Sequence, residues 1–299
     1  MNQSVVALVV TFNRKAYLEK VLDSLANQSY PIEKIIIVDN NSADGTADLV
    51  AEIKLKCPGI EYYNTGANLG GAGGFHFGFQ KIMDLSYDFL WLMDDDLLPE
   101  NDCLNNLIVN GTGDIRQPLR FNLDGSCAEL SPIKFDLKSR FIIRPKRLSV
   151  KDVVDSNTLK NIDIEGIPFE GPLITKQVVD YIGVPNPDFF IFYDDIDYSI
   201  RARKEGFRIK CVPAARATRL LVNVQSDDLN TWKGYFMLRN LFYILREYGQ
   251  NRFVRARPVL ITLLYISSLF LKRDWKRINI ARAAFRDSYK LENSENYKP

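Results

Sequence analysis

Four short apolar runs in the first hundred residues constrain the fold of this chain more than any other feature. They are SVVALVVTF (4–12), KIIIVDN (34–40), IEYYN (60–64) and FLWLMDD (89–95), and segments with helical spacing lie between them. Continuous runs rich in β-branched residues are typical of strands that are buried on both faces of a sheet. Strands that alternate with helices at this spacing predict right-handed crossovers, and therefore an α/β fold whose sheet is mainly parallel and flanked by helices.

Polar clusters stand at the ends of three of these predicted strands. The clusters are Thr11-Phe12-Asn13, Asp39-Asn40-Asn41 and Asp94-Asp95-Asp96. In open parallel sheets, ligands bind outside the carboxyl ends of the strands. We therefore expect these side chains to meet at one rim of the sheet and to form a binding site there.

The composition limits the classes of function. A chain of 299 residues, 46% hydrophobic and 25% charged, suits one large globular domain or a domain with an appendage. A net charge of +2 gives no strong field for nucleic acid, so no nucleic-acid partner is predicted. Four cysteines without a CxxC pair do not indicate a zinc site, and reduced thiols in a cytosolic setting are expected. The N-terminal apolar run lacks the basic segment and cleavage site of a signal peptide, so a buried strand fits it better.

The later part of the chain is less regular in sequence. Turn residues are frequent between 111 and 160, where the pattern places no element. A short helix is predicted near 176–182. The segment 187–213 then predicts a strand, a turn, a helix over 195–205 that ends at Gly206, and a further strand.

Asp94, Asp95 and Asp96 form the sharpest candidate site. Three adjacent carboxylates repel one another, which is hard to justify by stability alone. Carboxylates that follow a strand can chelate Mg²⁺ or Mn²⁺, and such a cation neutralises a diphosphate. The alternative is a solvated turn that caps a helix. The place of the aspartates on the predicted ligand rim favours the metal.

Other candidate groups each have a structural alternative. Asp39 can accept hydrogen bonds from a ribose or a base, or it can be a turn carboxylate. The glycine-rich stretch 67–75 suits the approach of a phosphate or sugar, and tight packing of a helix on a strand explains it equally well. The acidic cluster of Asp194, Asp195 and Asp197 can supply a general base, or it can stabilise a helix N-terminus. The single histidine, His76, is expected to be a packing or surface residue, so a Ser-His-Asp triad is not expected.

Five segments in order resemble the motifs of the family 2 inverting glycosyltransferases. They are VVTFNR (9–14), IIIVDNNSADGT (36–46), NLGGAGGF (68–75), WLMDDD (91–96) and FIFYDDIDYSIRARKEGF (190–207). The resemblance implies a GT-A fold with a Rossmann-like sheet. The combination of NLGGAGGF and MDDD is similar to the branch that transfers galactofuranose from UDP-galactofuranose. Rhamnosyltransferases that use dTDP-rhamnose share much of this pattern.

The resemblance also implies roles for individual residues. Asp195 matches the catalytic base of a single-displacement reaction. Asp94 and Asp96 match the metal-binding DxD positions, which would hold Mn²⁺ or Mg²⁺. Groups near the nucleotide sugar would be Thr11, Asn13, Arg14, Asp39, Asn68 and Asp95. Groups on the acceptor side would be Phe169, Glu170, Gly171, Asp194 and Asp197.

The chain departs from the family at one position. Many relatives carry a histidine after a PxA segment that completes the metal site, and here VPAARATRL places Arg219 there. Either aspartates, phosphates and water hold the metal, or Arg219 itself neutralises the diphosphate.

The expected organisation is a GT-A domain over 1–225 and a helical, basic and amphipathic region over 226–299. The nucleotide-sugar half of the domain would cover about 1–110 and the acceptor half about 111–225. In the C-terminal region, basic residues flank VLITLLYISSLFL (259–271), which is shorter than the roughly 20 apolar residues that a spanning helix needs. This pattern favours peripheral contact with an anionic membrane surface, and packing on the domain or on another subunit is the alternative.

The expected function is therefore transfer of a sugar, galactofuranose first, from a nucleotide sugar to a glycan or lipid-linked acceptor in bacterial polysaccharide synthesis such as O-antigen. Such an enzyme would be cytoplasmic, or peripheral on the inner face of the cell membrane. A dTDP-rhamnose-dependent transferase is the nearest alternative. A nucleotidyltransferase is a weaker one, because VVTFNRKAY lacks a glycine-rich triphosphate loop. A non-catalytic scaffold that binds nucleotide sugars is the third.

Overall fold

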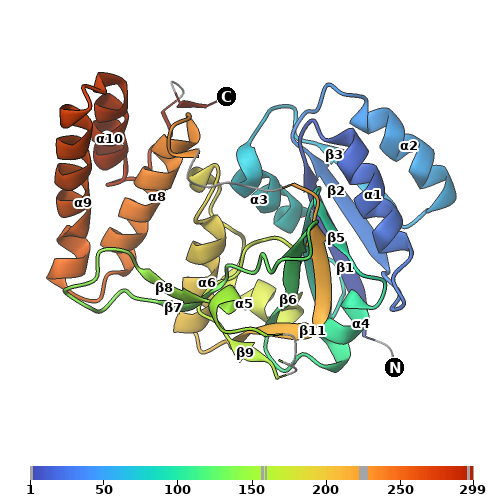
Figure 1. Ribbon diagram of the computed structural model, residues 1–299. Coiled ribbons are helices and arrows are strands. Elements are labelled where there is room, and N and C mark those ends of the chain that lie inside the picture. Colours follow the sequence, from blue (N-terminus) through green and yellow to red (C-terminus); the bar gives the residue numbers. More distant parts are fainter. Residues whose placement is uncertain (1–2, 156–157, 159, 222–227, 295–296, 299) are drawn as a thin grey trace.

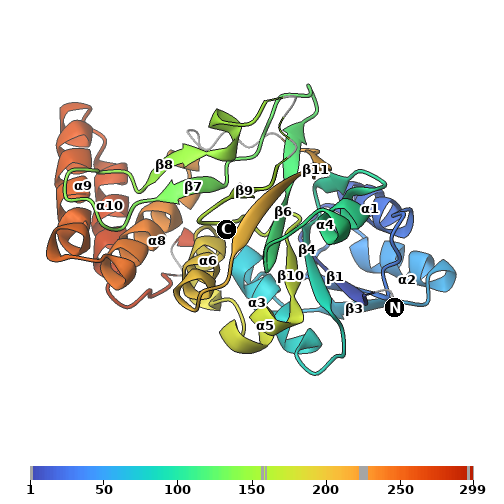
Figure 2. The same cartoon turned by 90° about the horizontal axis from the view of Figure 1, so that it is seen from below.

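A mixed sheet forms the centre of the molecule (Figures 1 and 2). The computed structural model describes residues 3–155, 158, 160–221, 228–294 and 297–298. The strand order is β3-β2-β1-β4-β10-β6-β11-β5, and β9 pairs with β11. The strands are β1 (Val5–Thr11), β2 (Lys34–Asp39), β3 (Ile60–Asn64), β4 (Phe89–Asp94), β5 (Leu97–Pro99), β6 (Ile115–Asn122), β9 (Ile162–Asp163), β10 (Leu173–Thr175) and β11 (Ile209–Arg219).

The first half of the sheet is parallel, as the sequence predicts. β1 pairs with β2 and β4 in parallel, and β2 pairs in the same way with β3. The helices between these strands are α1 (Lys15–Ala26), α2 (Thr46–Lys56) and α3 (Gly70–Ile82). Val6, Leu8 and Val10 of β1 belong to the core cluster that includes Phe75 and Phe79 of α3. The intervening residues of β1 belong to the cluster that contains the buried face of α1. Both faces are therefore covered, which explains the continuous apolar run.

The second half of the sheet mixes directions. β10 is antiparallel to β4 and β6, β11 is parallel to β6, and β5 returns antiparallel to β11. The short helices here are α4 (Cys103–Val109) and α5 (Lys176–Ile182), followed by α6 (Asp194–Lys204). A separate hairpin of β7 (Pro132–Phe135) and β8 (Lys146–Ser149) extends toward the C-terminal helices (Figure 2).

Three helices form a layer at one side of the molecule (Figure 1). They are α8 (Lys233–Tyr248), α9 (Arg252–Leu271) and α10 (Trp275–Asp287). The boundary expected at 225/226 lies in 222–227, outside the described residues. The apolar run 259–271 lies in α9, which has 20 residues. A window of 18 residues in this helix has a mean hydropathy of 1.5, and only 22% of that window is buried. By length and composition α9 could therefore cross a membrane, although the apolar run alone is shorter than a spanning helix needs.

The glycine-rich stretch 67–75 shows the tight packing of a helix on a strand that was one of its two expected explanations, because α3 begins at Gly70 and the glycines lie in its first turns. The packing is close: a Cβ on Gly74 would lie 2.5 Å from Val10 Cγ1 of β1, so only glycine lets the helix lie this near the sheet. The apolar segment 189–193 was predicted to be a strand, but it is an irregular loop after a 3₁₀ turn at Pro187–Phe189.

Candidate functional site

The triple aspartate connects the ends of β4 and β1. Asp95 accepts hydrogen bonds from Thr11 Oγ1 (2.8 Å), from the Phe12 N–H (3.2 Å) and from Arg14 Nη1 (2.9 Å). Arg14 also lies 3.3 Å from Asp96. Thr11, Arg14 and Asp95 were all expected near the nucleotide sugar. The structure brings them together in one network, in which Asp95 anchors the turn after β1.

Asp94 and Asp96 carry charge that their surroundings do not fully balance. Burial raises the pKa of Asp94 well above the usual range, and repulsion from Glu170 and the adjacent aspartates adds to this. Burial and Glu170 together raise the pKa of Asp96 to about 6, although Arg14 opposes the shift. Hard oxygen donors with excess negative charge are the ligand set that Mg²⁺ and Mn²⁺ prefer. The chemistry of these two aspartates therefore fits a divalent cation.

Glu170 links the two acidic clusters electrostatically. Its carboxylate raises the pKa values of Asp94 and Asp96 and contributes to that of Asp195. Two arginines face it: Arg120 Nη1 is hydrogen-bonded to it, and Arg219 Nε lies 3.1 Å away. Glu170 is therefore close enough to both acidic clusters to influence their charge, although only the triple aspartate follows the end of a strand.

Arg120 is shared between Glu170 and a second carboxylate, Glu129. Arg120 Nε and Nη2 donate to Glu129 at 2.7 and 3.1 Å, and Glu129 is fully buried. Burial alone would lower the pKa of Arg120, but the two glutamates raise it above its usual value. Sequence reasoning did not single out Arg120 or Glu129, because they lie on the segment 111–160 whose elements it could not place.

Arg219 ends β11 beside the triple aspartate. The Leu220 N–H donates to the Asp96 carbonyl at 2.8 Å, and Arg219 is paired in register with Leu97 of β5. The buried Arg219 Nε has no well-formed hydrogen bond to any described residue, because its approach to Glu170 is close but poorly aligned. A buried guanidinium nitrogen without a hydrogen bond is costly unless a ligand completes it.

Asp39 organises the loop after β2. Its carboxylate accepts from the N–H and Oγ of Ser42 (2.9 and 2.6 Å) and from Tyr62 Oη (2.6 Å), and the residue is fully buried. Burial and this hydrogen bond raise the pKa of Tyr62 to about 12. Asn13, which has φ of 51°, joins the same loop because its Oδ1 accepts from the Ala43 N–H at 2.8 Å.

Asn68 prepares the start of α3. Its Oδ1 accepts from the Gly70 N–H at 3.0 Å. Gly70 has φ of 71°, and a Cβ there would lie 2.2 Å from the carbonyl oxygen of Phe190. The start of α3 therefore touches the loop that leads to the second acidic cluster.

The second acidic cluster forms the first turn of α6. Asp194, Asp195 and Asp197 all lie there, where negative charge is favourable at a helix N-terminus. Burial raises the pKa of Asp194 to about 7, and burial together with Asp194 raises the pKa of Asp195 well above its usual value. Asp197 is bonded to Arg201 Nε (2.9 Å) and to Tyr248 Oη (2.5 Å). Asp195 Oδ1 accepts from the Ile196 N–H at 2.6 Å, and a raised pKa is the property that a general base at this position would need.

The loop before α6 is strained. Phe190, Phe192 and Tyr193 have φ values of 62°, 64° and 69°. Each such conformation costs about 1–3 kcal/mol in a residue with a side chain and persists only where the surroundings enforce it. A strand cannot contain three such residues, which is why the strand prediction fails here.

The other two acceptor-side candidates are packed inside. Phe169 is buried between Phe75, Phe79 and Tyr198, with ring centroids 5.0, 6.5 and 5.8 Å away. Gly171 is also buried, has φ of 92°, and accepts a hydrogen bond from Trp91 Nε1 at 2.8 Å. Among Phe169, Glu170 and Gly171, only Glu170 contacts the charged residues at the rim of the sheet. Phe169 and Gly171 pack in the interior and hold this segment in place.

Sequence reasoning also missed residues of α8. Asn240 and Arg239 donate to carbonyl groups of the loop before α6, and Tyr248 bonds Asp197. These partners are about 50 positions apart in the chain, so no local pattern signals them. His76, by contrast, lies where packing was expected and makes a 2.8 Å contact with the Pro185 carbonyl oxygen.

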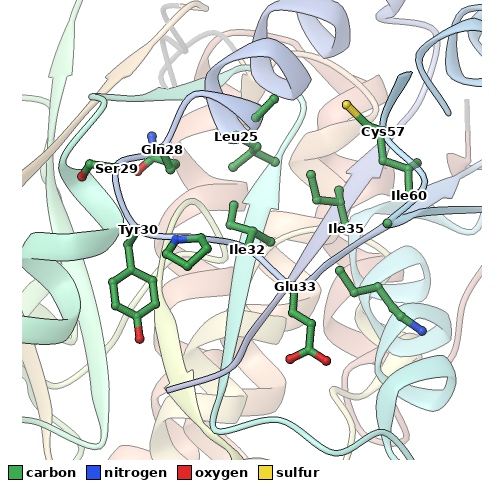
Figure 3. Close-up of a pocket in the computed structure, with 13 residues that line it drawn as sticks. Leu25, Gln28, Ser29, Tyr30, Ile32, Glu33, Ile35, Cys57 and Ile60 are labelled. Carbon is green, nitrogen blue, oxygen red and sulfur yellow. The ribbon is translucent and has the colours of Figure 1, made fainter. Parts of the chain in front are cut away.

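One surface pocket lies away from this site. It lies at the opposite ends of the strands, around Leu25, Tyr30, Glu33, Ile35 and Ile60 (Figure 3). Lys34 and Ile60 begin β2 and β3, whereas the triple aspartate lies at the carboxyl end of β4. Within the ranges that the structure describes, no group of three or more His, Cys, Asp or Glu side chains is arranged to hold a metal.

Proteins with known names are similar in sequence to this chain over most of its length. Residues 6–109 match the profile of the family described as Glycosyl transferase family 2. The galactofuranosyltransferase GlfT1 of Mycolicibacterium smegmatis is 29% identical over 83% of this chain and 85% of that protein. The dTDP-rhamnosyl transferase RfbF of Shigella flexneri is 20% identical over 89% and 88%.

Solved structures share the fold. The mannosyltransferase PcManGT of Pyrobaculum calidifontis, solved with GDP-Man and Mn²⁺, is 15% identical and superposes with a TM-score of 0.56. The match covers 99% of this chain and 78% of that protein. The mixed central sheet flanked by helices is that of the GT-A glycosyltransferases, as the sequence predicts. The chain is therefore a glycosyltransferase with the GT-A fold, and its residues 6–109 match glycosyl transferase family 2.

Proposed function

We propose that this enzyme transfers galactofuranose, with inversion, from UDP-galactofuranose to a glycan or lipid-linked acceptor in bacterial polysaccharide synthesis. The observation that carries the proposal is the meeting of two acidic clusters around Glu170. The Glu170 carboxylate raises the pKa values of Asp94 and Asp96 in the first cluster and contributes to the raised pKa of Asp195 in the second. Similarity to GlfT1 supports the choice of donor sugar.

The roles follow from the chemistry of each group. Asp195 removes the proton from an acceptor hydroxyl, and the oxygen attacks the anomeric carbon from the face opposite the diphosphate. The bond from the anomeric carbon to the phosphate oxygen breaks, and the nucleoside diphosphate leaves. Asp94 and Asp96 would hold Mn²⁺ or Mg²⁺, which when bound supplies charge neutralisation for the diphosphate. The groups on the nucleotide side would be Thr11, Asn13, Arg14, Asp39, Asn68 and Asp95. Among them, Asp95 holds Thr11 and Arg14 in place.

Arg219 stands where many relatives have a metal-binding histidine. We assign it to the diphosphate, since it is a buried cation beside Asp96 whose Nε lacks a well-formed hydrogen bond within the described residues. It pairs with Glu170 in the free enzyme. A guanidinium at this place reduces the share of the diphosphate charge that a metal must balance.

Donor binding by calorimetry tests the donor and the metal together. UDP-galactofuranose, UDP-galactopyranose and dTDP-rhamnose are compared, each with and without Mn²⁺ or Mg²⁺. We expect selective, metal-enhanced binding of UDP-galactofuranose. Selective binding of dTDP-rhamnose would move the assignment to the RfbF-like alternative, and binding without any metal effect would give the neutralising role to Arg219 alone.

Turnover tests the base. Asp195→Asn keeps the size of the side chain and removes its basicity, so transfer should be nearly abolished while donor binding persists. Wild-type turnover in this variant would refute the assignment of the base. Release of pyrophosphate from a nucleoside triphosphate would instead indicate a nucleotidyltransferase. Binding without turnover across acceptors, in the wild type, would indicate a scaffold.

We also propose that α9 places the enzyme on the inner face of the cell membrane. The exposed side chains of this helix include Leu260, Leu263, Leu264 and Leu271, which are 48–85% exposed. Exposed basic residues lie at both ends of the helix: Arg252, Arg255, Lys272, Arg273 and Lys276. An apolar face flanked by cations complements an anionic lipid surface, and it would bring the site near a lipid-linked acceptor.

Flotation with vesicles of phosphatidylcholine and phosphatidylglycerol tests this surface. Leu263→Glu/Leu264→Glu should abolish flotation without loss of fold. Leu55→Glu, at an 88% exposed leucine of α2, is the matched control and should float like the wild type. Equal flotation of both variants would refute the proposal. Dimers of the wild type that the double variant loses would assign the face to a second copy instead.

A further inference from the structure

The loop 188–193 leads into the first turn of α6, where the candidate base lies. Residues of α8 and α3 donate hydrogen bonds to the carbonyl groups of this loop. Asn240 Nδ2 donates to the carbonyl oxygens of Phe189, Ile191 and Phe192 at 3.1, 2.7 and 2.8 Å. Arg239 Nη2 donates to those of Asp188 (2.7 Å) and Phe189 (3.0 Å). The remaining carbonyl, that of Phe190, accepts from the Ala72 N–H of α3 at 3.0 Å. Every carbonyl from 188 to 192 therefore has a partner outside the loop.

This loop needs such support. Phe190, Phe192 and Tyr193 adopt positive φ values without being glycine. Such a backbone relaxes unless its surroundings forbid it. Tyr193 is the N-cap of α6, and Asp194 and Asp195 follow directly. A change in the loop therefore changes the direction in which the two carboxylates point.

The two donors are themselves fixed. Arg239 and Asn240 are both 0% exposed, and Arg239 Nε donates to Asn240 Oδ1 at 2.8 Å. The Arg239 guanidinium also stacks over Phe236, with 5.0 Å to the ring centroid, and donates to the Glu292 carbonyl at 2.8 Å. The two N–H groups of the Asn240 amide serve three carbonyl oxygens of one loop, and Arg239 fixes the orientation of that amide. Such a network restricts the conformations that the loop can adopt.

We infer that Arg239 and Asn240 are positioning residues for catalysis, because they clamp the strained loop 188–193 in the conformation that presents Asp195 to the acceptor. The inference rests on the proposed role of Asp195 as the base. It makes α8 a working part of the active site rather than an appendage. Neither residue is proposed to touch donor or acceptor.

The test separates the chemical step from donor binding and from general stability. Asn240→Leu keeps the branched shape of the side chain and removes all three donor contacts. Arg246→Met is the matched control, since this α8 residue contacts Phe285, Ser288 and Tyr289 of the C-terminal segment instead of the loop. Turnover is measured as UDP release from UDP-galactofuranose with and without an alkyl glycoside acceptor. Donor affinity is measured by calorimetry, and the order of the backbone over 187–197 is measured by amide hydrogen exchange.

In Asn240→Leu we expect kcat to fall about 10- to 100-fold, because a small misplacement of a reacting group has effects of this size. The donor dissociation constant should stay within about twofold of the wild type, since a loss confined to kcat marks a contribution to the chemical step. Amide exchange should accelerate over 187–197. Arg246→Met should change neither kcat nor this exchange. If Asn240→Leu does not fold, Asn240→Ser, which keeps one donor group, should show the same effects in smaller measure.

Each outcome decides the inference. Unchanged kcat in the Asn240 variants, or unchanged exchange over the loop, would overturn it. Equal losses in Asn240→Leu and Arg246→Met would overturn it as well, because they would show a general effect of α8. If Asp195→Asn retained turnover while Asn240→Leu lost it, the base assignment would fail but the clamp would stand. Without measurable turnover in the wild type, the exchange comparison alone decides.

Discussion

Removal of Arg120 should destabilise the protein strongly. Arg120 makes two hydrogen bonds to Glu129 and one to Glu170, and it is nearly buried. In Arg120→Met, the fully buried Glu129 keeps contacts only from the Ser131 N–H (2.9 Å) and Gln117 Nε2 (3.4 Å) among the described residues. Breaking a buried pair in this way costs about 3–5 kcal/mol, because one charge is left uncompensated.

The pH dependence of this loss identifies its cause. In the wild type, burial alone would raise the pKa of Glu129, but Arg120 and the hydrogen bonds hold it below its usual value. Ionised Glu129 therefore stabilises the folded wild type at pH values above the pKa that Glu129 has in the unfolded chain. This stabilisation is lost as the pH falls through the lower pKa of the folded state. In Arg120→Met the pKa of Glu129 should rise above the unfolded value, so stability is lost as the pH rises. The difference in unfolding free energy between the two proteins should therefore shrink as the pH falls from neutrality toward 5. Each unit by which the pKa of Glu129 differs between them contributes about 1.4 kcal/mol to this change.

Urea unfolding at several pH values measures this difference. Arg208→Met is the control, because the Arg208–Asp114 pair is 3.8 Å long and the arginine side chain is 67% exposed. Such a surface pair contributes less than about 1 kcal/mol. The double variant Arg120→Met/Glu129→Gln should recover a large part of the stability. A loss below about 1 kcal/mol in Arg120→Met, or no recovery in the double variant, would refute the reasoning.

Three further predictions concern the rim and its support. Initial rates of UDP release should rise with pH between pH 5.5 and 9. Burial raises the pKa of Asp194 to about 7 and that of Asp195 well above its usual range, so the base is protonated in acid. A rate that stays flat down to pH 5.5 would contradict this. Tyr248→Phe should lower the unfolding free energy by about 1.5–3 kcal/mol in urea titration, because the 2.5 Å bond to the Asp197 carboxylate is lost, and no change would show that water replaces it fully. Gly74→Ala should lower stability by about 1–3 kcal/mol through overpacking against β1, and a thermal midpoint equal to the wild type would show that the helix shifts freely.

The placement of α8 changes how the C-terminal region is understood. Sequence patterning describes 226–299 as a helical, basic and amphipathic appendage. In the structure, Asn240 and Tyr248 of α8 contact the loop and helix that carry Asp194, Asp195 and Asp197. A truncation that removed this region would therefore disturb the candidate site as well as the exposed face of α9. Point substitutions on that face are for this reason the sounder test of membrane contact.

The N-terminal half of the sheet and one side of the site follow from the sequence alone. The strands β1 to β4 lie close to the predicted ranges, because a continuous β-branched run bounded by turn residues has one low-energy environment, a strand covered on both faces. The parallel order then brings the carboxyl ends of those strands to one edge. The triple aspartate and the Asp39 loop are therefore placed by local pattern and topology together.

Only the tertiary structure decided the conformation of 188–193, the pairing of Glu170 with Arg120 and Arg219, and the burial of Phe169. An apolar stretch such as 189–192 favours a strand by its own propensity, yet it adopts positive φ values because Asn240, about 50 residues further along the chain, satisfies its carbonyl groups. Each positive φ costs about 1–3 kcal/mol, and this cost is offset by buried hydrogen bonds to distant partners, worth about 1 kcal/mol each, together with the burial of Phe189 and Phe190. A sequence pattern reports only the local preference for a strand, and the contacts with distant partners exist only once the chain is folded.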